Sequence, residues 1–251
     1  MIERTEQEGI VTLRLAHGKA SLLDIELVEA IARAIAEYNA DDGARVLVLT
    51  GTGSIFSAGV DLVRLVDGGT AYVDRLFPAL AHMLLDLFSI PKPLIVATNG
   101  HAIAGGCIMT LAGDYRLMAA GNGRIGIPEL LVGVPFPPTI LEAIRFALPP
   151  QHLQMLVYTG RTVLPDEALR LGMVDEVVDA AQFETRTMEL ARHFAGLPQH
   201  AFLLAKRQVR DKIISRAKHY AAELEGDALE LWRDPATHQV IRDYLAKTVR
   251  K

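Results

Sequence analysis

The sequence predicts an α/β fold in which a mainly parallel sheet is followed by a helical C-terminal region. Two observations predict it: short β-branched runs alternate with helical patterns in the first half of the chain, and helical patterns dominate after Pro137. No repeat, low-complexity segment or polar linker divides the 251 residues. We expect an α/β core over residues 1–195, and a helical region over residues 196–251 that packs on this core or on a neighbouring subunit.

The first predicted elements are a strand, a helix and a second strand. Residues 10–16 are β-branched and alternate in polarity, as in a strand with one buried face. Asp24 can cap a helix that extends to Tyr38, and residues 45–50 form an apolar run typical of a buried strand. The helix is indicated by apolar residues at helical spacing, namely Leu27, Val28, Ile31 and Ile35.

The next predicted elements repeat this alternation. Residues 71–89 have the pattern of a long amphipathic helix, which must end before Pro91 because proline cannot continue a helix. Residues 94–98 form another buried strand, residues 114–119 a fourth strand and residues 124–127 a short fifth. Since helices connect these short strands, a parallel sheet is expected.

The C-terminal part of the sequence is predicted to be almost entirely helical. Glycines and prolines punctuate it at intervals that suit short and medium helices. The predicted helices span residues 139–147, 151–158, 166–171, 181–195, 200–215, 218–232 and 235–249.

Composition and charge exclude several classes of partner. The formal charge of −4 argues against nucleic acid, whose phosphates require a basic face. No apolar run reaches the ~20 residues of a membrane span, so no membrane contact is expected. The charged N-terminus is unlike a secretory signal, and Cys107 is the single cysteine, so we expect a cytoplasmic protein without disulfides. His17, His82, His152 and His193 lack metal-ligand spacing, so no metal is expected.

Two segments follow predicted strands and combine small residues with a turn. Residues 56–62 read Phe-Ser-Ala-Gly-Val-Asp-Leu, and a bend at these small residues can leave backbone N–H groups free to bind an anionic oxygen. Residues 99–107 place Gly105 and Gly106 at the start of a short apolar helix, whose N-terminus carries partial positive charge. Tight strand-to-helix packing without a ligand is the alternative explanation for both segments.

A third segment, residues 126–135, contains a single carboxylate in an apolar stretch. Burial disfavours the ionised form of a carboxyl group and raises its pKa, which suits proton transfer near neutral pH. Glu129 is therefore a candidate acid or base. The alternative is a surface glutamate that begins a helix after Pro128.

These three segments, in this order, resemble the motifs of the crotonase (enoyl-CoA hydratase/isomerase) superfamily: F-x-A-G-x-D-L, N-G-x-A-x-small-G-G-C and P-E-x-x-x-G. Residues 91–97 and 159–175 also resemble the family, and the likeness extends over about residues 8–210. It implies a spiral of ββα units with the CoA site in the core, an acyl-CoA thioester as ligand and a place in fatty acid metabolism. It further implies no cofactor apart from the coenzyme A of the substrate, and assembly as a homotrimer or a dimer of trimers.

The resemblance also implies roles for individual residues. The N–H groups of Ala58 and Gly105 would form an oxyanion hole for the thioester carbonyl, and Glu129 would be the catalytic acid or base. CoA phosphates would need cations, for which Lys19 and, on a C-terminal helix, Lys206-Arg207 are candidates. The expected substrate-binding residues are Lys19, Ala20, Ser57, Gly59, Asp61, Gly106, Ile108 and Phe136.

One departure from the family pattern favours a particular reaction. Family members commonly carry a second catalytic carboxylate at the position of Ile108, and hydratases that resemble this chain use two carboxylates to add water. Moving a double bond needs a single base, so we expect an enoyl-CoA isomerase. A hydratase with a recruited second group and a non-catalytic acyl-CoA-binding protein remain alternatives. Hydrolase or dehalogenase chemistry would need a further group, for which Thr139 and His101 are the nearest candidates.

Overall fold

The computed structural model describes residues 1–248 and contains two β-sheets. The larger sheet has six strands in the order β1-β2-β3-β5-β7-β10. The smaller sheet has four, in the order β4-β6-β8-β9. The bounds of the strands are β1 Ile2–Gln7, β2 Ile10–Leu15, β3 Val46–Gly51, β4 Ile55–Ser57, β5 Leu94–Thr98, β6 His101–Ile103, β7 Tyr115–Ala119, β8 Ile125–Gly126, β9 Thr162–Val163 and β10 Glu176–Val178.

Successive strands alternate between the two sheets, so that β3, β5 and β7 lie in the larger sheet and β4, β6 and β8 in the smaller. A helix follows each pair: α2 after β4, α3 after β6 and the short 3₁₀ helix η1 after β8. All strand pairs between these units are parallel, and the antiparallel pairs β1–β2 and β8–β9 lie at sheet edges. The predicted α/β fold built from ββα units is therefore confirmed.

Nine α-helices and η1 are present within residues 1–248. As predicted, Asp24 caps α1, and its carboxylate accepts a hydrogen bond from the Leu27 N–H at 2.8 Å. The bounds of the helices are α1 Ile25–Ala40, α2 Leu62–Ser89, α3 Gly105–Leu111, η1 Glu129–Val132, α4 Pro138–Ala147, α5 Pro150–Thr159, α6 Pro165–Arg170, α7 Phe183–Gly196, α8 Gln199–Arg233 and α9 Pro235–Thr248.

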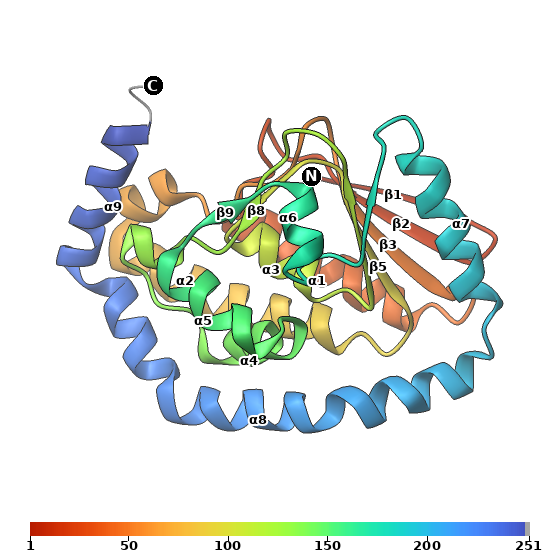
Figure 1. The fold of residues 1–251 in the computed structure, drawn as a ribbon. Coiled ribbons are helices and arrows are strands. Elements are labelled where there is room, and N and C mark those ends of the chain that lie inside the picture. The colour runs from red at the N-terminus through yellow and green to blue at the C-terminus, as the bar shows by residue number, and fades with distance from the viewer. Residues whose placement is uncertain (249–251) are drawn as a thin grey trace.

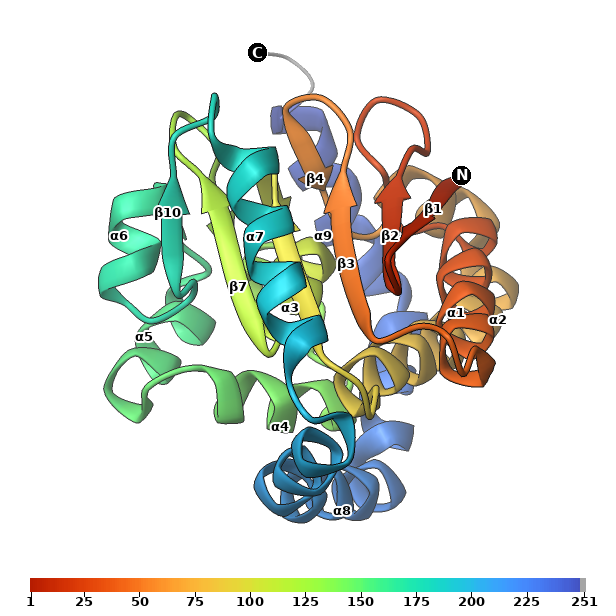
Figure 2. The ribbon, with the colours of Figure 1, turned by 90° about the vertical axis from the view of Figure 1, so that its right-hand side faces the viewer.

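The helices form layers on both faces of the larger sheet (Figure 1). Figure 2 shows α7 lying in front of one face of this sheet, between β7 and β3. On the other face, buried side chains of β2, β3 and β5 join those of α1, α2, α3 and α4 in one large hydrophobic cluster. The C-terminal helices also contribute to this cluster through Ala228, Trp232 and Ile241, so the hydrophobic core extends beyond residue 195.

The long helix α8 is joined to the core by buried charges. Asp114 accepts hydrogen bonds from Lys206 at 2.5 Å and forms an ion pair with Arg210 at 2.8 Å. Arg210 also donates to the carbonyls of Phe88 and Ala112, near the C-terminal ends of α2 and α3. Positive charge at such helix ends is favourable because free carbonyls concentrate negative partial charge there.

Several predicted boundaries were wrong. The helices expected over residues 200–215 and 218–232 form one helix, α8, because Arg216 and Ala217 between them are good helix formers. Helix α2 begins at Leu62 rather than residue 71, and Gly69 interrupts it with φ 60° and ψ −153°. Strands β1, β4, β6, β9 and β10 were not predicted. The last residue of the helix expected over residues 235–249 lies outside the described residues. Within residues 1–248, no helix has the length and apolar character needed to cross a membrane.

Candidate active site

Glu129 occupies the first position of η1, directly after β8 and Pro128. Its side chain is buried, with 7% of the residue exposed, and within residues 1–248 its Oε2 atom has no hydrogen-bond partner. Burial raises the pKa of the carboxyl group from 4.5 to about 8, and the backbone N–H of Glu129 itself opposes this shift in part. The expected burial of this carboxyl group is observed. A pKa near 8 allows Glu129 to exchange protons near neutral pH.

Glu129 lines a small cavity of about 120 Å³ whose other walls are mostly apolar. Among the described residues that line it, Glu129 is the only one with a carboxylate. Ile108 and Phe136, both predicted to bind substrate, also line this cavity. The lining residues are Ala58, Val60, Leu62, Leu80, Leu84, Ile103, Ala104, Gly105, Ile108, Pro128, Glu129, Val132, Val134, Pro135, Phe136, Pro137, Trp232 and Tyr244.

The two small-residue bends meet beside this cavity. A Cβ atom on Gly59, whose φ is +81°, would lie 2.7 Å from the Cβ of Ala104, so glycine is required where the bends cross. A Cβ on Gly106 would lie 2.3 Å from the carbonyl oxygen of Ser57. Gly106 therefore permits close packing of α3 against β4 and does not line the cavity. Gly105 does line it, at the N-terminus of α3.

The prediction that the Ala58 N–H is an oxyanion donor is contradicted by its hydrogen bond. This N–H donates to the carbonyl of Ala20 at 3.0 Å and is not free for a ligand. Val60, two residues later, also lines the cavity, and in the described part of the chain its N–H has no acceptor. Its neighbours are held in place, because the Gly59 carbonyl accepts from the Leu23 N–H at 2.8 Å.

The remaining predicted substrate-binding residues lie around these bends. The hydroxyl of Ser57 donates to the carbonyl of Ser21 at 2.8 Å, and Asp61 caps α2 by accepting from the Arg64 N–H at 3.0 Å. Lys19 is exposed on the loop after β2, next to Ala20. Ser57 and Asp61 therefore shape the bend, while Lys19 is a cation open to solvent near it.

The sequence profile of the enoyl-CoA hydratase/isomerase family matches residues 5–242, nearly the whole chain. The chain belongs to this family. The fold and the family resemblance predicted from the three motifs are thereby confirmed.

Relatives with different activities are similar to this chain. Rat mitochondrial enoyl-CoA delta isomerase 1 is 27% identical, and the alignment covers 100% of this chain and 88% of the relative. The carnitinyl-CoA dehydratase of Salmonella arizonae is 32% identical, over 90% of this chain and 91% of the relative.

Solved structures support the same fold. The probable enoyl-CoA hydratase EchA3 of Mycobacterium tuberculosis is 29% identical, with a TM-score of 0.83 over 90% of this chain and 95% of its own. Human mitochondrial delta3-delta2-enoyl-CoA isomerase has a TM-score of 0.93 over 99% and 98% of the two chains. Its identity of 22% makes this a likeness of fold.

The C-terminal helices complete the cavity of this enoyl-CoA hydratase/isomerase family member. This contribution was not predicted from the sequence. Trp232, at the end of α8, and Tyr244, on α9, both line it. The Trp232 indole N–H donates to the carbonyl of Pro135 at 2.9 Å. The sequence shows a tryptophan near the end of a predicted helix. It does not show that this tryptophan would bond to a carbonyl more than ninety residues away.

Four other sequence candidates do not line the cavity. Lys206 is buried against Asp114, and burial lowers its pKa to about 8, so it is not positioned to reach CoA phosphates from this chain. Arg207 is exposed on the same helix and pairs with Asp211 at 3.5 Å. Neither His101 nor Thr139 lines the cavity. In the described residues, no group of three or more His, Cys, Asp or Glu side chains is arranged to hold a metal.

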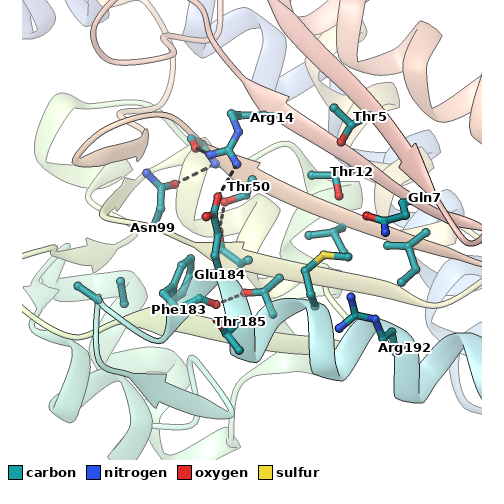
Figure 3. A pocket seen from close by; sticks show the side chains of 18 of the residues that line it. Thr5, Gln7, Thr12, Arg14, Thr50, Asn99, Phe183, Glu184, Thr185 and Arg192 are labelled. Atoms are coloured by element: carbon teal, nitrogen blue, oxygen red, sulfur yellow. Dashed lines mark hydrogen bonds and ion pairs between the residues drawn. The ribbon is translucent and has the colours of Figure 1, made fainter.

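A larger and more polar hollow, of about 900 Å³, lies between α7 and the larger sheet (Figure 3). Thr5 and Thr12 line it from β1 and β2, and Arg14 bridges to Glu184 of α7 at 3.1 Å. It shares no residue with the cavity at Glu129. Both arginines that line it are paired with carboxylates, Arg14 with Glu184 and Arg192 with Glu8 at 3.7 Å. The smaller cavity, which holds the buried Glu129, is therefore the candidate active site.

Proposed function

We propose that this chain isomerises 3-enoyl-CoA to 2-enoyl-CoA, with Glu129 as its single acid/base group. The observation that carries the proposal is the composition of the cavity. Glu129 is the sole carboxylate among the described residues lining it. Ile108, at the position where the family resemblance implies a second carboxylate, also lines the cavity and is apolar. An apolar cavity excludes water and so favours proton transfer within the substrate.

The oxyanion donors in this proposal are the N–H groups of Val60 and Gly105. Both residues line the cavity, and Gly105 begins α3, where N–H groups have no partner within the helix. Removal of a proton next to a thioester places negative charge on the carbonyl oxygen. Two fixed N–H donors stabilise that charge, and loss of one such donor typically costs on the order of 3 kcal/mol of transition-state stabilisation.

Glu129 moves one proton in two steps. Its ionised carboxylate takes a proton from C2, and the electron pair of the broken C–H bond delocalises over C2, C3, C4 and the thioester oxygen. The resulting carboxylic acid then returns the proton to C4, which leaves the double bond between C2 and C3. A pKa of about 8 suits both steps, because each protonation state is accessible near neutral pH.

Hydration of 2-enoyl-CoA is the second candidate. The 32% identity with a carnitinyl-CoA dehydratase favours it, since that relative is named for the removal of water. A hydratase would need a second group to position water, and Tyr244 is the one other titratable side chain among the described residues that line the cavity. A protein that binds acyl-CoA without turnover would retain the bends but would not need a buried carboxyl such as Glu129.

A paired assay separates these functions. Wild-type protein and Glu129→Gln are each incubated with 3-enoyl-CoA and with 2-enoyl-CoA, and products are identified by mass spectrometry and NMR. We expect the wild type to convert 3-enoyl-CoA to an isomer of equal mass. Glu129→Gln should lose this conversion while it still binds CoA esters. Formation of 3-hydroxyacyl-CoA as the main product would favour hydration, and binding without conversion would favour the non-catalytic function.

We also propose, for the same substrate, that Lys19 contacts the CoA phosphates and that the chain forms homotrimers or dimers of trimers. Exposed apolar side chains along α8 support association, because large apolar side chains in water favour burial: they are Leu204, Val209, Leu224 and Leu231. Light scattering after size-exclusion chromatography measures the assembly mass, and Lys19→Ala should weaken CoA binding without changing that mass.

A further inference from the structure

We propose that Trp232 limits the length of the acyl chain, so that this protein accepts short-chain acyl-CoA esters of up to about six carbon atoms. This inference rests on the proposed function, because it assumes that the acyl group occupies the cavity at Glu129. It assigns a specificity role to a residue of the C-terminal region, more than one hundred positions away from Glu129 in the sequence.

Trp232 is held in the cavity wall from three directions. Its indole N–H donates to the carbonyl of Pro135 at 2.9 Å, in the segment that also carries Phe136. Its ring packs edge-on against Phe77 of α2, with 5.4 Å between the ring centroids. Its own carbonyl is within hydrogen-bonding distance, 2.8 Å, of the Nε2 atom of His238. Only 3% of the residue is exposed.

These contacts make the wall rigid. Rotation of the indole would break its hydrogen bond to the partly buried carbonyl of Pro135. Rotation would also remove the edge-to-face contact with Phe77. A longer acyl chain therefore cannot enter by a simple change of the Trp232 rotamer, as it could past an unanchored leucine or methionine.

The size of the cavity sets the limit. An apolar protein cavity of about 150 Å³ takes up benzene, which has six carbon atoms. By the same measure, the cavity of about 120 Å³ at Glu129 has space for about five carbon atoms beyond the thioester carbonyl. Atoms C2 to C4 must lie there for the proposed proton transfer, so about two further carbons fit before the chain meets the wall.

Binding of saturated acyl-CoA esters tests this inference without any need for turnover. Dissociation constants are measured by calorimetry for butanoyl-, hexanoyl-, octanoyl- and decanoyl-CoA. For the wild type we expect affinity to increase about fourfold for each methylene that enters the cavity, and to stop increasing after hexanoyl-CoA. For Trp232→Ala the increase should continue to decanoyl-CoA.

Two further variants serve as controls. Leu231→Ala removes an exposed neighbour of Trp232 that does not line the cavity, and it should keep the wild-type limit. Trp232→Phe keeps an aromatic ring against Phe77 but loses the N–H donor, so it should give an intermediate limit. Because Phe is a smaller change, Trp232→Phe also tests the inference if Trp232→Ala does not fold.

The outcomes separate the inference from the proposed function. A wild-type affinity that increases evenly to decanoyl-CoA would overturn the inference, as would an unchanged limit in Trp232→Ala or, if that variant does not fold, in Trp232→Phe. The inference would also be overturned if Leu231→Ala raised the chain-length limit as much as Trp232→Ala. A protein that shows the limit but never isomerises 3-enoyl-CoA would contradict the proposed function alone.

Discussion

The backbone N–H of Ala58 donates a hydrogen bond to the carbonyl of Ala20 at 3.0 Å. This bond joins the loop after β2 to the bend after β4 and uses the amide that the family motif first suggests as an oxyanion donor. The bend then turns through Gly59, and the next N–H, that of Val60, belongs to a residue that lines the cavity. The position of one hydrogen bond thus decides which amide can face a substrate.

Replacement of Val60 by proline tests this assignment, because proline removes the N–H and keeps a side chain of similar bulk. We expect kcat for isomerisation to fall by about 10²–10³-fold, the usual effect of losing one oxyanion donor. Val60→Ala retains the N–H and should stay near wild-type activity. Steady-state kinetics check both variants, with circular dichroism to confirm their folding. Equal activity of Val60→Pro and Val60→Ala would rule out the Val60 donor.

The pH dependence of kcat/KM should report the ionisation of Glu129. Because the carboxylate form must accept a proton from C2, and burial raises its pKa to about 8, kcat/KM should increase about tenfold per pH unit below pH 8 and level off above it. Initial rates with 3-enoyl-CoA over this range measure the profile. A plateau that already begins near pH 5 would mean that the base ionises like an exposed carboxyl group.

Stability should depend on pH in the opposite direction. The pKa of Glu129 is 4.5 in the unfolded reference and about 8 in the folded protein, so between these values the folded state binds more protons. The free energy of unfolding should therefore fall as pH rises from 4.5 to 8, by about 1.4 kcal/mol per unit where the states differ by one proton. Glu129→Gln lacks this titration. Urea unfolding at pH 4.5 and pH 8 measures the free energy of unfolding, which should decrease less between these values in Glu129→Gln than in the wild type. Equal decreases in the two proteins would argue against the raised pKa of Glu129.

Substitution of Ile108 by glutamate should introduce water addition. Ile108 is buried and lines the cavity with Glu129, so a carboxyl there would supply the second group that hydration requires. We expect Ile108→Glu to form 3-hydroxyacyl-CoA from 2-enoyl-CoA, and isomerisation to fall at least about tenfold because a nearby like charge further raises one carboxyl pKa. Ile108→Gln has nearly the same size without the charge and should not gain hydration. Chromatographic product analysis compares the two.

Much of the fold could be predicted because its elements carry strong local signals. The buried strands β3 and β5 are uninterrupted apolar runs, and α1 has a capping aspartate with apolar residues at helical spacing. Strands β4 and β6 have three residues each, which is too short for a periodic pattern. Strand β1 has an exposed polar sequence at the sheet edge and is held there by pairing with β2.

The candidate site could be predicted in part for the same reason. A lone carboxylate in an apolar segment made Glu129 a candidate acid or base, with a surface glutamate as the alternative, and the structure shows that it is buried. The distinction between Ala58 and Val60 depends on a contact with Ala20, which the motif does not contain. The place of Trp232 in the cavity wall depends on how α8 packs across the core, so no local pattern could reveal it.

A deuterium label at C2 of 3-enoyl-CoA reports whether Glu129 carries the proton from C2 to C4. If one buried carboxyl carries the proton in a cavity without water, wild-type protein should form 2-enoyl-CoA with part of the label at C4, as seen by NMR. Glu129→Gln should form no product. Product with a hydroxyl group at C3, or full activity in Glu129→Gln, would show that Glu129 is not the single acid/base group of an isomerase.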